Sequence, residues 1–215
     1  MIQTQDFTKG VIWKQLLFFF FPILIGSFFQ QLYNTVDTII VGQAVGTSAL
    51  AAVGSTGNLT NLIVNFYVGL STGASVVIAQ YYGAQNNKKI HQAVHTSYIL
   101  AIVSGILMML FGLFFSYQCL DAIGTPHDIL NDATLYMQLY FLCMIPGAIY
   151  NIGAGILRAV GDSKRPLYYL IVCSIVNVVF DFIFVVIFHQ GIAGAAIATV
   201  IAQSVCAILV TIQLM

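Results

Sequence analysis

Long apolar stretches separated by short polar turns occupy almost the whole chain. Six stretches are each long enough to cross about 30 Å of hydrocarbon as an α-helix, and they fall at residues 14–41, 48–82, 90–115, 129–157, 167–188 and 192–215. The alternation of apolar and polar residues typical of a membrane β-barrel is missing from the sequence. The pattern therefore predicts an all-α integral membrane protein, a bundle of six transmembrane helices, with residues 1–13 as a short interfacial segment before it.

The composition supports a membrane location and narrows the choice of partners. Hydrophobic residues make up 60% of the 215-residue chain and charged residues 7%, whereas a soluble domain carries about 25% charged residues. Seven Lys and Arg balance seven Asp, and the sequence has no Glu, so the net charge favours no nucleic-acid partner. The four cysteines lie mostly inside apolar stretches without the spacing of a metal site or a disulfide framework, and we interpret them as small apolar fillers.

The basic residues are distributed asymmetrically in this six-helix scheme. All seven fall on one side of the membrane, namely Lys9, Lys14, Lys88, Lys89, Arg158, Lys164 and Arg165. Because loops rich in Lys and Arg stay in the cytoplasm, the scheme predicts a multi-pass protein of the cell (cytoplasmic, inner) membrane with both termini cytoplasmic.

Several positions in the first and fourth spans indicate bending and substrate contact. Pro22 and Gly26 in the first span, and Pro146 in the fourth, are places where a membrane helix can bend. The second half of the first span is unusually polar for a spanning helix. We assign its residues Gln30, Tyr33 and Asn34 to a substrate cavity.

The fifth span carries an amide and a carboxylate inside an apolar run of twenty residues, 168–187. Asn177 and Asp181 are four residues apart, so an α-helix places both on one face. A carboxylate in the membrane interior costs at least ~2.5–3.5 kcal/mol and usually faces a bundle interior or a water-filled cavity. For Asn177 alone, a hydrogen bond that joins two helices is the simpler interpretation. For Asp181 we favour a functional role.

Asp37 is a second acid within an apolar span, in the same outer half of the membrane as Asp181. By itself it could simply reach water near the helix end. Two acids at similar depth could instead share a site that holds a proton near neutral pH, or binds a cation when both are ionised. Asn177 and Thr199 would add neutral oxygens, which suit a hard cation such as Na⁺. We predict a cation-coupling site, with Asp37 and Asp181 as the metal ligands if the ion is Na⁺.

Other candidate sites are weaker. His91 and His95 lie four residues apart, a spacing that can bind a metal, but HExxH is missing and Lys88 and Lys89 are close by. We interpret the two histidines as a solvated interfacial pair. No serine has a partnering His or Asp at a recognisable spacing, and the sequence shows no glycine-rich phosphate loop. We therefore expect no enzymatic activity and no cofactor beyond the coupling ion.

Several short motifs follow one another in a characteristic order. They are Val36-Asp37-Thr38 after Pro22, Leu50-Ala51-Ala52-Val53, Gln80-Tyr81-Tyr82-Gly83-Ala84, Leu157-Arg158-Ala159-Val160-Gly161-Asp162 before Pro166, Asn177-x-x-x-Asp181, and Gly191-x-x-Gly194-Ala195-Ala196. By these motifs essentially the whole chain resembles the N-terminal six-helix lobe of a MATE (multidrug and toxic compound extrusion) transporter.

The resemblance implies a function and a site. A MATE protein is an antiporter that exports cationic or amphipathic drugs and other xenobiotics against inward H⁺ or Na⁺. Its N-lobe cation site uses an acid of the first helix, an Asn and an Asp of the fifth, and a Thr of the sixth. By that resemblance these roles fall on Asp37, Asn177, Asp181 and Thr199.

The chain differs from this family in length, since MATE transporters have twelve helices in two lobes with the substrate cavity between them. Six spans return a chain to its starting side, so a second copy would have the same orientation and a homodimer could mimic the two lobes. We expect instead a partial product whose second lobe is missing. Membrane lipid and a small cationic or amphipathic substrate are the other expected partners.

Two alternative functions stay open. One is a flippase for lipid-linked oligosaccharides from the same superfamily, which would need a cationic cavity, whereas the sequence places no Lys or Arg in the middle of a span. The other is a half-length or scaffold protein that transports nothing.

Overall fold

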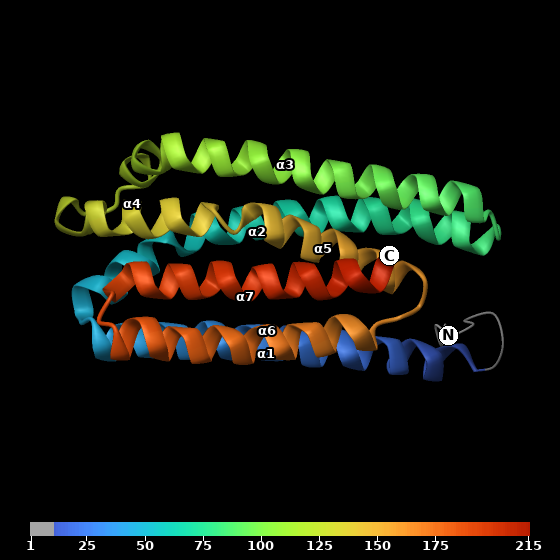
Figure 1. The fold of residues 1–215 in the computed structure, drawn as a ribbon, viewed down its shortest axis with the longest axis horizontal. Helices are drawn as coiled ribbons and strands as arrows, with labels where there is room; N and C mark the ends of the chain where they lie inside the picture. Colours follow the sequence, from blue (N-terminus) through green and yellow to red (C-terminus); the bar gives the residue numbers. More distant parts are fainter. Residues whose placement is uncertain (1–10) are drawn as a thin grey trace.

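The computed structural model describes residues 11–215 as a bundle of long helices that lie roughly side by side (Figure 1). The helices of this described part are α1 (Ile12–Ala44), α2 (Thr47–Gly83), α3 (Asn87–Ala122), α4 (His127–Phe141), α5 (Met144–Ala159), α6 (Lys164–Asp181), the π-helix η1 (Phe182–Ile187) and α7 (Gly191–Leu214). Five helices are long and apolar enough to cross a membrane, and six spans result when the bent pair α4–α5 counts as one. The predicted all-α membrane fold is confirmed.

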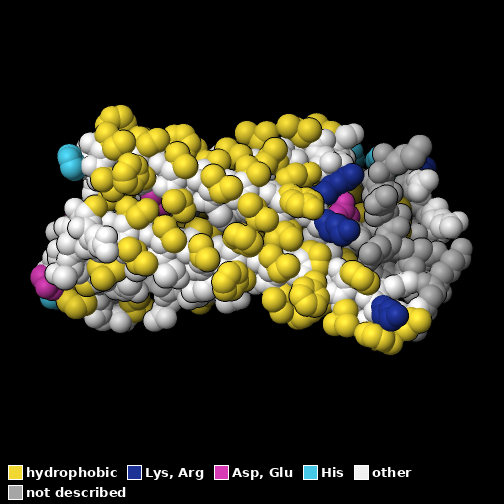
Figure 2. Space-filling view, turned by 90° about the horizontal axis from the view of Figure 1, so that it is seen from below, with side chains coloured by type: hydrophobic (Ala, Val, Ile, Leu, Met, Phe, Trp, Pro, Cys, Tyr) yellow, Lys and Arg dark blue, Asp and Glu magenta, His cyan; other side chains and the backbone are white. Residues whose placement is uncertain are grey.

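Large apolar side chains cover the outside of the bundle. Phe18, Leu62, Leu107 and Phe114 are each more than 60% exposed, and apolar side chains spread over most of the face in Figure 2. Such a surface fits contact with lipid tails. Because lipid tails are as apolar as these side chains, helices in a membrane associate through close packing and interhelical hydrogen bonds.

Small residues provide that close packing inside the bundle. A Cβ added to Gly105 of α3 would lie 2.8 Å from the α5 backbone, and one added to Gly112 would overlap the Phe141 ring. Between α2 and α5, the Ser71 hydroxyl donates a hydrogen bond to the carbonyl oxygen of Asn151 at 2.6 Å. Glycine and serine therefore set how closely α2, α3 and α5 approach one another.

Two elements differ in detail from the predicted spans. The third span was expected to end at residue 115, but α3 continues to Ala122. Residues 116–122 contain no Gly or Pro, and the Ser116 hydroxyl donates back to the Gly112 carbonyl within the helix. The chain turns only at Gly124, whose φ of +80° suits a residue without a side chain.

The fourth span, predicted over 129–157 with Pro146 as a bending point, is broken into α4 and α5, which are bent by 50°. Pro146 has no N–H to donate to the Leu142 carbonyl, so the regular hydrogen-bond ladder is interrupted there. The backbone N–H groups of Leu142 and Cys143 instead bond to carbonyls three residues earlier, which closes the end of α4. The fifth span is also irregular, because α6 changes to the π-helix η1 directly after Asp181.

The segment between α5 and α6 contains Gly161 and Asp162 of the motif that precedes Pro166, and both residues have a structural role. Gly161 has a φ of +87°, a conformation that side chains disfavour. Asp162 accepts a hydrogen bond from the Arg165 backbone N–H at 3.2 Å and forms an ion pair with the Arg165 side chain at 3.3 Å. The motif therefore ends one helix and caps the next.

Basic side chains gather at one end of the bundle, where α1 begins and α7 ends (Figures 1 and 2). The Lys14 ammonium lies 5.7 Å from the Trp13 ring centroid, as expected for an interfacial anchor. Lys9 and the rest of residues 1–10, which form most of the predicted interfacial segment, lie outside the described residues.

Candidate functional site

Two acidic side chains meet between α1 and the junction of α6 with η1. Asp37 is 9% exposed and Asp181 is fully buried, and the two carboxyl groups lie near enough to affect each other's ionisation. Asp181 is the last α-helical residue before the π-helix, and π-helical turns occur frequently at functional sites. The structure therefore brings together the two acids that the sequence predicts to share a site.

Asn177 and Thr199 join α6 to α7 on the same buried face. The Asn177 amide donates a hydrogen bond to the Thr199 hydroxyl oxygen at 3.4 Å, and the Thr199 hydroxyl donates to the Ala195 carbonyl at 3.1 Å. Because its proton is engaged by Ala195, the Thr199 hydroxyl can accept from Asn177. This arrangement fixes the amide so that its oxygen stays available one helical turn from Asp181.

Within residues 11–215, four buried oxygens around this site accept no hydrogen bond: Asp37 Oδ1, Asn177 Oδ1 and both carboxylate oxygens of Asp181. Two ionised carboxylates in contact have no proton to share, and each buried unpaired charge costs on the order of several kcal/mol. A single proton between them, or a cation held by these oxygens, would satisfy the group. Two carboxylates with an amide and a hydroxyl oxygen also form a ligand set suited to a hard cation.

A cavity of about 1150 Å³ opens beside the acid pair. Asp37 and Thr199 lie on its wall, whereas Asn177 and Asp181 are 1% and 0% exposed and lie deeper. The cavity therefore gives one member of the acid pair a route to ions and substrate.

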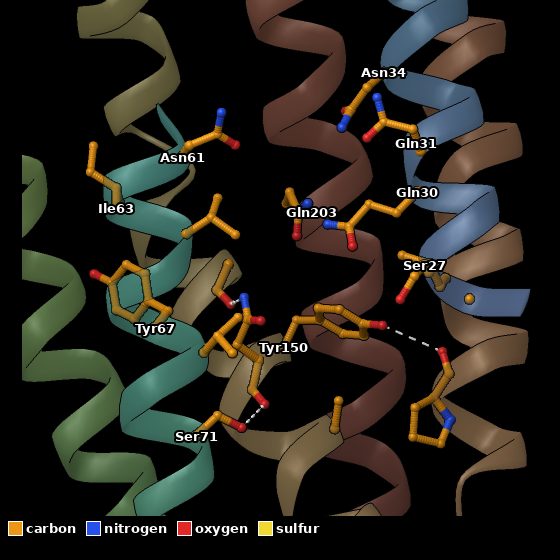
Figure 3. Close-up of a pocket in the computed structure, with 18 of the residues that line it drawn as sticks. Ser27, Gln30, Gln31, Asn34, Asn61, Ile63, Tyr67, Ser71, Tyr150 and Gln203 are labelled. Carbon is orange, nitrogen blue, oxygen red and sulfur yellow. Dashed lines mark hydrogen bonds between the residues drawn. The ribbon is translucent and has the colours of Figure 1, made fainter. Parts of the chain in front are cut away.

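The predicted cavity residues Gln30, Tyr33 and Asn34 all line this space. With Asp37 they follow the i, i+3, i+4, i+7 spacing of a single helical face. In Figure 3 the Gln30 and Gln203 side chains extend toward each other, and Asn61 reaches in from α2. Neutral amides thus form much of the polar lining next to the acids.

The wall contributed by α2 was missed in the sequence analysis. Thr56, Thr60, Tyr67, Ser71 and Ser75 all line the cavity. They recur every four or seven residues, which is the spacing of one helical face, so a search for polar residues at that spacing would have found them.

Three further residues that line the cavity could not be recognised from their spacing in the sequence. Tyr136 and Tyr140 of α4 stack with ring centroids 6.2 Å apart, but aromatic residues are common in membrane spans. Arg158, in the last turn of α5, lines the basic end of the cavity. In the sequence, Arg158 belongs to a charged turn between two spans, so nothing indicated that it lines the cavity.

The residues assigned to helix bending differ in their surroundings. Pro22 lies inside α1, which continues through it without a break. Gly26 faces α6, where an added Cβ would lie 3.5 Å from Leu170, an ordinary van der Waals distance. Pro146 falls in the first turn of α5, just after the bend.

The histidine pair lies away from this site. His91 and His95 are both exposed. In the described part of the chain, no three His, Cys, Asp or Glu side chains gather closely enough to hold a metal ion.

Comparison with known proteins gives a consistent assignment. The MatE family model matches residues 22–183. The chain is 31% identical over 202 residues to the "Probable multidrug resistance protein YoeA" of Bacillus subtilis, covering 92% of this chain and 44% of YoeA. It is 29% identical over 204 residues to the "Probable multidrug resistance protein YpnP" of the same organism, covering 95% of this chain and 46% of YpnP.

A solved structure described as MATE in complex with MaL6 has a TM-score of 0.91 and 27% sequence identity, covering 100% of this chain and 48% of that chain. The chain thus spans less than half the length of the relatives that it matches. Since MATE proteins are transporters, the prediction that the chain is not an enzyme is confirmed. The chain is a member of the MatE family of multi-pass membrane transporters and corresponds to one six-helix lobe of its relatives.

Proposed function

We propose that this chain is the cation-coupled lobe of an exporter of cationic or amphipathic drugs, with Asp37 and Asp181 as the groups that bind the coupling ion. The observation that carries the proposal is that two buried carboxyl groups lie near each other, and that Asp37 Oδ1 and both Asp181 oxygens accept no hydrogen bond from a described donor. Such a pair needs a positive ion to be stable in the membrane interior. H⁺ and Na⁺ both meet that need.

Ion binding at this pair would change how α1 packs. Without an ion, two ionised carboxylates repel each other and push α1 away from α6 and η1. A bound proton or Na⁺ removes that repulsion and lets the helices close. Because Gln30 and Asn34 lie on the same face of α1 as Asp37, movement of this face reshapes the wall that a drug contacts.

The membrane orientation sets the direction of coupling. With the basic end in the cytoplasm, both acids lie in the outer half of the bundle, so the coupling ion enters from outside. One charge that moves through ~100 mV supplies ~2.3 kcal/mol, which contributes to exporting a drug against its gradient. The proposed location is the cell membrane, with both termini cytoplasmic.

A second six-helix unit completes the proposed transporter. The cavity is bounded by this lobe on one side, and the relatives are more than twice as long as this chain. We assign the missing wall to a second lobe, supplied by the same gene product or by another copy of this chain.

Export by cells tests this function. The chain is produced in cells that lack their own drug exporters, both by itself and fused to the second lobe of YoeA, and efflux of a fluorescent lipophilic cation is followed. We expect efflux from at least one of the two forms. Asp181→Asn should abolish it without lowering the amount of protein in the membrane.

Asp132→Asn is the matched control, because this carboxyl of α4 is exposed whereas Asp37 and Asp181 are buried. It should leave efflux unchanged. Efflux that survives Asp181→Asn would remove the acid pair from the mechanism. No efflux from either form of the unmodified chain would favour the scaffold alternative.

A further inference from the structure

Two buried cysteines meet at the interface between α6 and α7. Cys173 of α6 is 2% exposed and Cys206 of α7 is 0% exposed. Both belong to a small buried cluster with Ala202, against which Tyr150 and Tyr169 pack. The proposed transport mechanism uses neither thiol.

The hydrogen bonds of the two thiols are reciprocal. The Cys173 thiol donates to the Ala202 carbonyl at 3.1 Å, four residues before Cys206. The Cys206 thiol donates to the Tyr169 carbonyl at 3.3 Å, four residues before Cys173. Each sulfur therefore lies over the helical turn that precedes the other cysteine. The two thiols therefore lie beside each other across the interface, and a disulfide forms if the sulfurs turn from these carbonyls toward each other.

We propose that Cys173 and Cys206 form an oxidation site, at which a membrane-soluble oxidant of the quinone class joins α6 to α7 by a disulfide. The two thiols lose two protons and two electrons, one S–S bond forms, and the quinone becomes a hydroquinone. A dithiol reductant reverses the reaction by thiol–disulfide exchange. This inference goes beyond the proposed transport function. The test of disulfide formation does not require the chain to transport a drug.

The surroundings of the pair give an oxidant a route to it. Tyr150 packs against the thiol cluster and also lines the cavity. Its hydroxyl donates to the Pro166 carbonyl at 3.4 Å, a weak hydrogen bond at the cavity wall (Figure 3). Displacement of this one side chain would let a small neutral molecule in the cavity reach the sulfurs.

A disulfide here would act on the helices that hold the candidate cation site. Asn177 lies one turn after Cys173 on α6, and its hydrogen-bond partner Thr199 is on α7, the helix that carries Cys206. The bond would therefore fix the spacing between α6 and α7 next to these two residues. Oxidation would thus prevent α6 and α7 from moving relative to each other.

Thiol counting tests the proposal on the full chain in lipid vesicles. The vesicles are treated with duroquinone, or with copper–phenanthroline in air as a second oxidant, then denatured and labelled with a mass-tagged maleimide. We expect the four free thiols of the chain to fall to two, and dithiothreitol to restore four. Proteolysis of the oxidised chain should yield one linked pair of fragments, containing Cys173 and Cys206.

Matched variants identify the pair. The double variant Cys119→Ser/Cys143→Ser should lose both of its remaining thiols. Cys173→Ala and Cys206→Ala should each retain all three of theirs. Four free thiols after both oxidants, or linked fragments that contain Cys119 or Cys143, would overturn the proposal. A disulfide formed with copper–phenanthroline but not with duroquinone would show that the assigned oxidant class is wrong. The fragment analysis uses the unmodified chain, so it decides the pairing even if a variant fails to fold.

Discussion

At the scale of single residues, the free-energy cost of burying a carboxylate in the membrane allowed the candidate site to be predicted from the sequence. Asp37 and Asp181 stand out because a carboxylate in an apolar span is costly and needs a reason. Their contact is a fact of helix packing that the sequence could not supply, because it depends on how α1 lies against α6. Tyr136 was not found for a different reason, since a tyrosine in a membrane span carries no comparable cost.

Thr199 provides a test at this scale. Thr199→Val keeps the shape of the side chain but removes the oxygen that accepts from Asn177. Losing one such hydrogen bond costs about 1 kcal/mol, so we expect cation affinity to fall roughly fivefold. Thr199→Ser keeps the hydroxyl and should bind as the unmodified chain does. The ion concentration that half-saturates each purified protein measures the effect, and equal values for Val and Ser would contradict the assigned role.

At the scale of helices, hydropathy located the spans but not their irregularities. Apolar length identifies each crossing, yet the break between α4 and α5 and the π-helix η1 involve changes in backbone hydrogen bonding within continuous apolar sequence. Pro146 indicated a bend in the fourth span but not its exact place, which lies a few residues earlier. Gly26 faces α6 at ordinary van der Waals distance, and its role as a bending point stays a prediction.

Glycine packing between helices makes a second prediction. Gly112→Ala in α3 places a methyl group where the Phe141 ring lies, and overpacking of this kind costs about 1–3 kcal/mol. We expect a lower thermal unfolding temperature for this variant in detergent. Gly57→Ala is the control, because a Cβ on this glycine of α2 meets nothing within 4 Å. An equal effect of both substitutions would show that helix contact is not the cause.

At the scale of the whole molecule, the position of the basic residues was the most informative signal. The six-span scheme placed every Lys and Arg on one side, and the basic residues of the described chain gather at one end of the bundle. The second lobe, in contrast, cannot be derived from these residues. It is proposed only because this chain spans less than half the length of its relatives.

Reporter fusions test the orientation. A fluorescent protein that folds only in the cytoplasm is attached after Met215, and an alkaline phosphatase that is active only outside the cytoplasm is inserted after Gly124, between α3 and α4. We expect both reporters to be active. Fluorescence in the cytoplasm from a reporter inserted after Gly124 would contradict the orientation and place the acids in the inner half of the membrane.

Infrared difference spectroscopy of the purified chain in lipid tests most directly whether the two buried acids form one cation site. The carboxyl bands that change on pH titration, with and without Na⁺, are compared for the unmodified chain, Asp37→Asn, Asp181→Asn and the exposed control Asp132→Asn. If the two carboxyl groups share an ion, each single substitution removes or shifts the band of the remaining acid, and Asp132→Asn changes neither. If Asp181→Asn leaves the Asp37 band unchanged, the two acids act separately and the proposed coupling site does not exist.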